Sequence, residues 1–253
     1  MIFEVAPDLL LLLIGAAFAA GFVDAIAGGG GLITVPMLLL AGASPLEALS
    51  TNKIQGTFGA ATAAVSYAAA GHVDLRRQSV AAFVAFAAGA TGAMLASVVP
   101  TETLRLTLPV VLIGIAMFFA FKPGLTDIDR AQRITPATFT AFVVPIVGAY
   151  DGLLGPGAGA FYMLGFVMLA GYGVLKATAH TKLLNFASNL GGLAVFAISG
   201  APWWATGLCM AVAQIGGARL GARMAIRIGA KVIKPLLVIT STSLALRLVW
   251  QML

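Results

Sequence analysis

Four ionisable residues of this sequence lie inside long apolar stretches, two aspartates and two lysines. Asp24 comes shortly before a run of four glycines, and Asp151 comes shortly before three closely spaced ones. The two clusters are Gly28, Gly29, Gly30 and Gly31, and Gly155, Gly157 and Gly159. A carboxylate at membrane depth costs about 3 kcal/mol, so such a residue is typically functional. Two roles are open. Each aspartate either carries a coupling proton, because desolvation favours its neutral form, or accepts hydrogen bonds from N–H groups that a helix break leaves free.

The two lysines stand among amide side chains. Asn52 precedes Lys53, and Lys182, Asn185 and Asn189 are spaced i, i+3 and i+7, so they share one helix face. An ammonium group there could bind an anion or pair with an aspartate. The alternative is snorkelling, in which the long stem carries the charge to the lipid headgroups.

The glycine clusters predict breaks in two helices, because glycine costs a helix about 1 kcal/mol relative to alanine. A short helix that begins after such a break directs N–H groups and a positive dipole end into the membrane, which favours an anion. Close helix packing is the alternative for any glycine cluster. We interpret residues 216–221 as packing alone.

These residues recur because the chain contains an internal repeat. Asp24 and its glycines match Asp151 and its glycines at an offset of 127 residues, and Lys53 matches Lys182 at an offset of 129. The same offset of 129 pairs Gly92 with Gly221. The sequence therefore predicts a first repeat over residues 1–121, a polar linker over 122–135 and a second repeat over 136–253.

Each repeat is predicted to contain five apolar segments. They are Leu9–Ala27, Leu32–Ala41, Ala48–Ala70, Ser79–Val99, Leu104–Phe121, Pro136–Leu154, Phe161–Ala170, His180–Ser199, Trp203–Leu220 and Val232–Leu253. The second segment of each repeat is too short to cross a bilayer core of about 30 Å. Joined to its predecessor, it predicts a broken or re-entrant hairpin. Three further helices make the number of crossings in each repeat odd, so the repeats should have inverted topology.

Composition places the chain in a membrane. Hydrophobic residues make up 60% of the 253 positions and charged residues 9%, whereas soluble domains carry about 25% charged residues. The net charge of +6 is explained by loop charges that orient the chain, and no nucleic-acid partner is expected. Cys209 is the only cysteine, which excludes a paired-cysteine metal site. No cofactor, metal or catalytic residue is predicted.

The distribution of basic residues predicts the orientation. The side opposite the N-terminus collects twelve of them: Arg76, Arg77, Lys122, Arg130, Arg133, Lys176, Lys182, Arg219, Arg223, Arg227, Lys231 and Lys234. The N-terminal side collects three: Lys53, Arg105 and Arg247. Because basic loops stay in the cytoplasm, both termini should be periplasmic.

The repeated motif resembles the sulfite exporter TauE/SafE family, also called TSUP. The first copy is the stretch 24–36 with 48–53, and the second is 151–159 with 180–182. The resemblance implies a transporter of the bacterial inner membrane for sulfite, thiosulfate or sulfonates. The second copy has Phe161-Tyr-Met163 where the first has Thr34-Val-Pro36, so the two half-sites should differ.

We therefore expect an all-α integral membrane protein, a secondary transporter that moves a small sulfur oxyanion by alternating access. Coupling to protons is one option for its energy source. The expected substrate ligands are Gly28, Gly29, Gly30, Gly31, Asn52, Lys53, Gly155, Gly157, Gly159, Lys182, Asn185 and Asn189. Asp24 and Asp151 should couple protons or support the breaks. An anion channel and an intramembrane enzyme are the alternatives, although the histidines and Cys209 are too scattered for a catalytic cluster.

Overall fold

The computed structural model describes residues 3–100, 102–104, 110, 128–199, 202–229 and 231, and this part of the chain forms helices without strands. The elements are α1 (Pro7–Ala27), α2 (Gly31–Leu40), α3 (Pro45–Ala69), α4 (Ser79–Val98), α6 (Pro136–Thr138), the π-helical η1 (Phe139–Val143), α7 (Val144–Leu153), α8 (Ala158–Met168), α9 (Val174–Ser199) and α10 (Trp204–Ile228). The all-helical prediction is confirmed. The predicted segments Leu104–Phe121 and Val232–Leu253 fall almost wholly outside the described residues.

Four helices are long and apolar enough to cross a membrane within these residues. They are Pro7–Ala27, Ser79–Val98, Pro136–Leu153 (α6, η1 and α7 in succession) and Val174–Ser199. Helices α3 and α10 have 25 residues each, about 37 Å at 1.5 Å per residue. They are less apolar because α3 carries the polar residues around Lys53 and α10 carries Arg219, Arg223 and Arg227.

The short helices lie where the sequence predicts them. Helix α2 has 10 residues and α8 has 11. The chain reverses between α1 and α2, and this reversal brings Gly30 against Ala20 and Asp24 of α1. The break before α2 is thus a re-entrant turn, one of the two forms that the sequence left open.

Two helix bounds differ from the prediction by more than three residues. Helix α9 begins at Val174 rather than at His180, and α10 continues to Ile228 rather than ending at Leu220. In both cases a basic residue, Lys176 or Arg223, interrupts the apolar run without interrupting the helix. Helix α3 also begins earlier, at Pro45, so Lys53 and Lys182 are each eight residues from the start of their helix, deeper than predicted.

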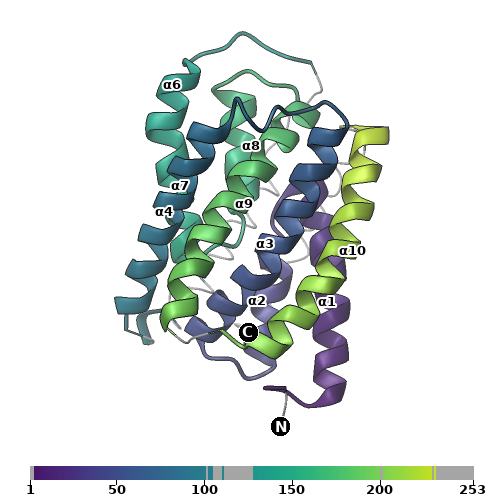
Figure 1. Cartoon of the computed structure of the whole chain (residues 1–253), viewed down its shortest axis with the longest axis vertical. Helices are drawn as coiled ribbons and strands as arrows, with labels where there is room; N and C mark the ends of the chain where they lie inside the picture. Colours follow the sequence, from purple (N-terminus) through teal and green to yellow (C-terminus); the bar gives the residue numbers. More distant parts are fainter. Residues whose placement is uncertain are drawn as a thin grey trace.

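The long helices run in both directions along the molecule. In Figure 1, α1, α3 and α10 begin at the lower end, whereas α4, α6 and α9 begin at the upper end. At the lower end, Glu4 joins the segment before α1 to the start of α10, because its carboxylate accepts hydrogen bonds from Thr206 N and Oγ1 at 3.1 and 2.7 Å. At the upper end Gln78 Nε2 donates to the carbonyl of His180 at 3.1 Å.

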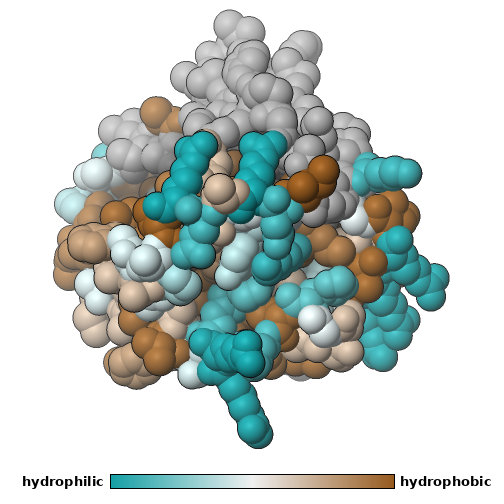
Figure 2. Space-filling model, turned by 90° about the horizontal axis from the view of Figure 1, so that it is seen from above, coloured by the Kyte–Doolittle hydropathy of each residue, from teal (hydrophilic) through white to brown (hydrophobic). Residues whose placement is uncertain are grey.

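Hydrophilic residues gather across the middle of the upper end, among hydrophobic ones, in the view from above (Figure 2). Asp129 accepts a hydrogen bond from Gly173 N at 2.6 Å and pairs with Lys176 at 2.9 Å. These two donors hold the pKa of Asp129 below its ordinary value. They also tie the end of the linker to the loop before α9.

Glycines allow the helices to cross closely. A Cβ on Gly92 of α4 would lie 2.0 Å from the carbonyl oxygen of Ala149 in α7. A Cβ on Gly217 or Gly221 of α10 would lie 2.0 or 2.3 Å from carbonyl oxygens of Phe18 and Phe22 in α1. The packing role predicted for residues 216–221 is confirmed. Exchanging the two repeats preserves the pattern of neighbours, since α10 packs on α1 and α3 as α4 packs on α7 and α9.

Candidate substrate site between the helix breaks

Each intramembrane lysine pairs with the aspartate of the other repeat. Lys182 Nζ of α9 lies 3.2 Å from Asp24 Oδ2 of α1, and it also donates to the backbone carbonyl of Asp24. Asp24 lies in the last turn of α1, and its carbonyl also accepts a hydrogen bond from Gly28 N at 2.9 Å. The ammonium group therefore neutralises a carboxylate and gives the end of α1 a second donor.

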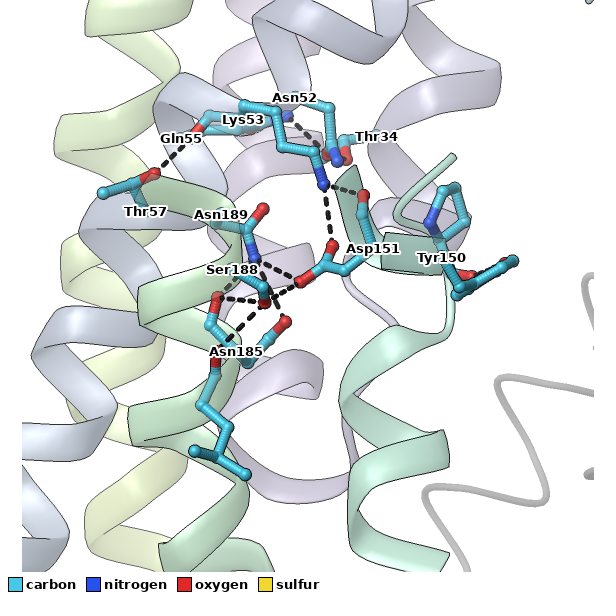
Figure 3. A network of polar contacts seen from close by, with 12 residues as sticks. Thr34, Asn52, Lys53, Gln55, Thr57, Tyr150, Asp151, Asn185, Ser188 and Asn189 are labelled. Carbon is cyan, nitrogen blue, oxygen red and sulfur yellow. Dashed lines mark hydrogen bonds and ion pairs between the residues drawn. The ribbon is translucent and has the colours of Figure 1, made fainter. Parts of the chain in front are cut away.

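The second pair has the same geometry with the repeats exchanged. Lys53 Nζ of α3 lies 2.7 Å from Asp151 Oδ1 and donates to the backbone carbonyl of Asp151 in α7. Asp151 Oδ2 accepts further bonds from Ser188 Oγ and, at 3.2 Å, from Asn189 Nδ2. Figure 3 shows Asp151 between Lys53 on one side and these two α9 residues on the other.

The burial of the two lysine side chains excludes one of the roles that the sequence left open for them. Both lysines are 0% exposed, so snorkelling to the headgroups is wrong. The structure instead shows the pairing with an aspartate that the sequence left open. The capping role of Asp24 is also present, because Asp24 Oδ1 accepts a hydrogen bond from Gly30 N at 3.1 Å. The carboxylate of Asp151 is held by side chains instead.

The two breaks touch each other. A Cβ on Gly28 would lie 2.5 Å from the backbone nitrogen of Ala160, at the start of α8. Gly28 and Gly155 also have positive φ angles of 80° and 93°, which L side chains rarely adopt. Residues other than glycine would therefore separate the two breaks and distort each of them.

A small cavity of about 20 Å³ lies between the breaks, room for roughly one water molecule. Its lining comes from both repeats: Asp24, Gly29, Gly30, Gly31, Asn52, Gly56, Asp151, Gly155, Gly157, Ala158, Gly159, Asn185, Asn189 and Gln214. Most predicted site residues are thus brought together. Gly28, Lys53 and Lys182 stand just behind the lining, the lysines because they are bound to the aspartates.

Two amide side chains direct their NH₂ groups toward the breaks. Asn52 Oδ1 accepts hydrogen bonds from Thr34 Oγ1 at 2.7 Å and from Gln55 Nε2 at 3.3 Å. Its Nδ2 would lie 3.2 Å from a Cβ on Gly31. Asn185 Oδ1 accepts from Asn189 Nδ2 at 3.0 Å, and Asn185 Nδ2 would lie 3.3 Å from a Cβ on Gly159. The oxygens are held by protein, which leaves the nitrogens as donors at the start of α2 and α8.

Sequence reasoning missed three lining residues, Gly56, Ala158 and Gln214. Gln214 carried a signal, because it is a polar residue in the middle of an apolar helix. It was passed over since its counterpart at the 129-residue offset is Ala85, so the repeat did not mark it.

A larger cavity of about 470 Å³ lies at the upper end, lined in part by Arg77, Gln78, Tyr172, Lys176 and His180. Neither the glycine breaks nor the two intramembrane aspartates line this larger cavity. The small cavity is the better candidate site, because the paired charges and both breaks converge there. Among the described residues no group of three or more His, Cys, Asp or Glu side chains is placed to bind a metal ion.

The sequence was compared with known proteins. The family model "Sulfite exporter TauE/SafE" matches residues 13–248. A probable membrane transporter protein, ORF9 of Sinorhizobium sp, is 54% identical over 97% of this chain and 94% of its own length. The probable membrane transporter proteins YfcA of Escherichia coli K12 and one of Haemophilus influenzae are 43% and 39% identical, each over 98% of this chain and over 93% and 97% of their own lengths.

No solved structure matches the chain. The family match nevertheless covers nearly the whole sequence, including both repeated motifs and all the residues that line the small cavity. These three relatives are named as probable membrane transporters, which points to transport rather than to an enzyme. The chain therefore belongs to the sulfite exporter TauE/SafE family of membrane proteins.

Proposed function

We propose that this protein is a secondary transporter for a small sulfur oxyanion, namely sulfite, thiosulfate or an organosulfonate. It would work in the bacterial inner membrane with both termini periplasmic. The family description supports the sulfur oxyanion, and the transporter names of the relatives support movement across a membrane. The orientation rests on the excess of basic residues at the upper end of Figure 1.

The observation that carries the proposal is the pair of amide donors at the breaks. Asn52 and Asn185 come from different repeats, and each has its oxygen bound within the protein and its nitrogen beside the start of a short helix. Helix N-termini carry about half a positive charge and favour anions. Two such ends with two NH₂ groups form a site that suits an oxyanion of a few atoms.

The paired charges tune this site rather than bind the substrate. Two lysines and two aspartates cancel formally, so the resting cavity carries no net charge from them. A proton taken up by either aspartate would weaken its ion pair and leave one positive charge beside the cavity. Both aspartates line this cavity, and the hydroxyl of Tyr67 nearby donates to the carbonyl of Ala25 at 2.8 Å. Anion binding would thereby be coupled to proton uptake.

The arrangement of the repeats supports alternating access. Matching helices run in opposite directions, and exchanging the repeats preserves their neighbours. We infer two inverted repeats that rock about the central cavity, as in other transporters with broken helices. The cavity of about 20 Å³ is then a contracted state that must open to admit an oxyanion.

The test is calorimetric titration of sodium sulfite, under anaerobic conditions, into the purified protein. Asn52→Leu and Asn185→Leu should each weaken binding by about tenfold or more, the effect of losing one hydrogen bond to a charged group. Thr62→Val is the matched control, since Thr62 of α3 is half-buried, does not line the small cavity and donates its hydroxyl to the carbonyl of Phe58 at 2.8 Å. Unchanged affinity in both asparagine variants would show that the anion binds elsewhere.

A further inference from the structure

The two halves of the cavity differ in the polar groups that they contribute. At the 129-residue offset, Asn185, Ser188 and Asn189 of α9 correspond to Gly56, Gly59 and Ala60 of α3. Ser188 and Asn189 donate to Asp151, so their polar groups are used within the protein. The first repeat has no polar side chains at these positions with which to contact Asp24.

Gln214 of α10 fills the space that Gly59 leaves. A Cβ on Gly59 would lie 2.7 Å from Gln214 Nε2, and a Cβ on Gly21 would lie 2.4 Å from the Gln214 carbonyl oxygen. Both glycines are therefore needed to admit this residue to the cavity. The corresponding residue of α4 is Ala85, whose methyl group offers no hydrogen bond. Gln214 is thus the polar contribution of one half alone.

The side-chain oxygen of Gln214 has no partner within the part of the protein that the structure describes. Gln214 is 4% exposed and lines the cavity, yet its Oε1 has no hydrogen-bond partner among the residues that the structure describes. Leaving a buried acceptor without a partner is costly, so such a group in a cavity points to a ligand that donates to it. Asp24, which lines the same cavity, is a second acceptor on that side.

We propose that Gln214 is a direct ligand of the transported anion and selects anions that carry an N–H or O–H donor beside their oxyanion oxygens. The inference rests on the proposed function. Asn52 and Asn185 donate to the oxyanion oxygens, and Gln214 Oε1 accepts from the added donor. A site built to bind a donor discriminates strongly against an analogue that lacks it, because its own acceptor then stays buried and unpaired.

The test compares two monoanions of nearly equal size, sulfamate and methanesulfonate, which differ by an NH₂ group in place of CH₃. Calorimetric titration into the wild-type protein should show sulfamate binding tighter by roughly tenfold or more. Gln214→Met should remove most of this preference by weakening sulfamate binding. Gln78→Met is the matched control: Gln78 is also buried with an unpartnered Oε1, but it lies at the upper end, away from the small cavity. It should keep the wild-type ratio.

A second matched pair covers the case in which Gln214→Met does not fold. Hydroxymethanesulfonate should bind the wild-type protein more tightly than ethanesulfonate, because only the former has a donor in place of the terminal methyl group. Equal affinities within both pairs, or an unchanged ratio in Gln214→Met, would overturn the role of Gln214 and leave the proposed function standing. If none of the four anions and no sulfite binds, the proposed function is overturned together with this inference.

Discussion

The crossed ion pairs join residues that are far apart in the sequence and buried. Lys53 and Asp151 are 98 residues apart, and Lys182 and Asp24 are 158 apart. A buried charge that loses its partner is strongly destabilising, whereas removing both charges of a pair is often neutral. The stability of the protein should therefore depend on each lysine keeping its own partner, the aspartate of the other repeat.

We predict that Lys53→Met lowers the free energy of unfolding by about 3–5 kcal/mol, because Asp151 is left charged and unpaired. Adding Asp151→Asn should recover most of this loss, since asparagine carries no charge and can still accept from Ser188. Adding Asp24→Asn instead should recover none of it and should itself leave Lys182 unpaired. Thermal unfolding in detergent compares the three variants. Equal rescue by the two asparagine substitutions would contradict the crossed pairing.

At the scale of the helices, neighbouring helices approach closely where a glycine of one helix contacts the backbone of the other. In α4 and α7, a Cβ on Gly152 would lie 1.9 Å from the carbonyl oxygen of Gly89, so neither helix can yield without moving the other. These crossings set how deep the aspartate of α7 lies against α9. Helix positions therefore control the geometry of the charge pairs.

We predict that Gly92→Ala destabilises the protein by about 1–3 kcal/mol, the usual cost of overpacking, because its Cβ would overlap the Ala149 carbonyl group. Gly15→Ala is the control: a Cβ at Gly15 of α1 meets no atom within 4 Å. It should be neutral or stabilising by up to about 1 kcal/mol, the difference in helix propensity. The midpoint of thermal unfolding separates the two. A similar loss in both variants would mean that glycine flexibility matters rather than close packing.

The sequence predicts the helices better than it predicts their contacts. Long apolar runs and glycine breaks place most helices within a few residues, because lipid exposure and glycine act locally. The start of α9 was misplaced since Lys176 interrupts hydropathy without interrupting helix formation. The pairing of Lys53 with Asp151 depends on how distant helices pack, so local patterns left it as one option. Gln214 was missed because its partner glycines, Gly21 and Gly59, reveal its space only in three dimensions.

At the scale of the whole molecule, the site lies where both repeats meet. The short helices α2 and α8, the lysines of α3 and α9, and Gln214 of α10 all converge on one small cavity. Because each half supplies charges that the other neutralises, relative movement of the halves must strain or exchange the ion pairs. We infer that this coupling of motion to charge distinguishes the protein from an open pore.

Counterflow in liposomes tests that claim most directly. Vesicles containing the protein are loaded with unlabelled sulfite and diluted into a trace of radiolabelled sulfite. The proton and potassium concentrations are equal on both sides, and valinomycin holds the membrane potential at zero, so that an anion channel cannot accumulate label. Alternating access predicts that label accumulates transiently above its equilibrium level, because carriers returning inward exchange it for the unlabelled pool. Asn185→Leu should reduce the overshoot. Uptake that rises only to equilibrium in the wild-type protein would indicate a channel, and no uptake above empty vesicles would contradict sulfite transport itself.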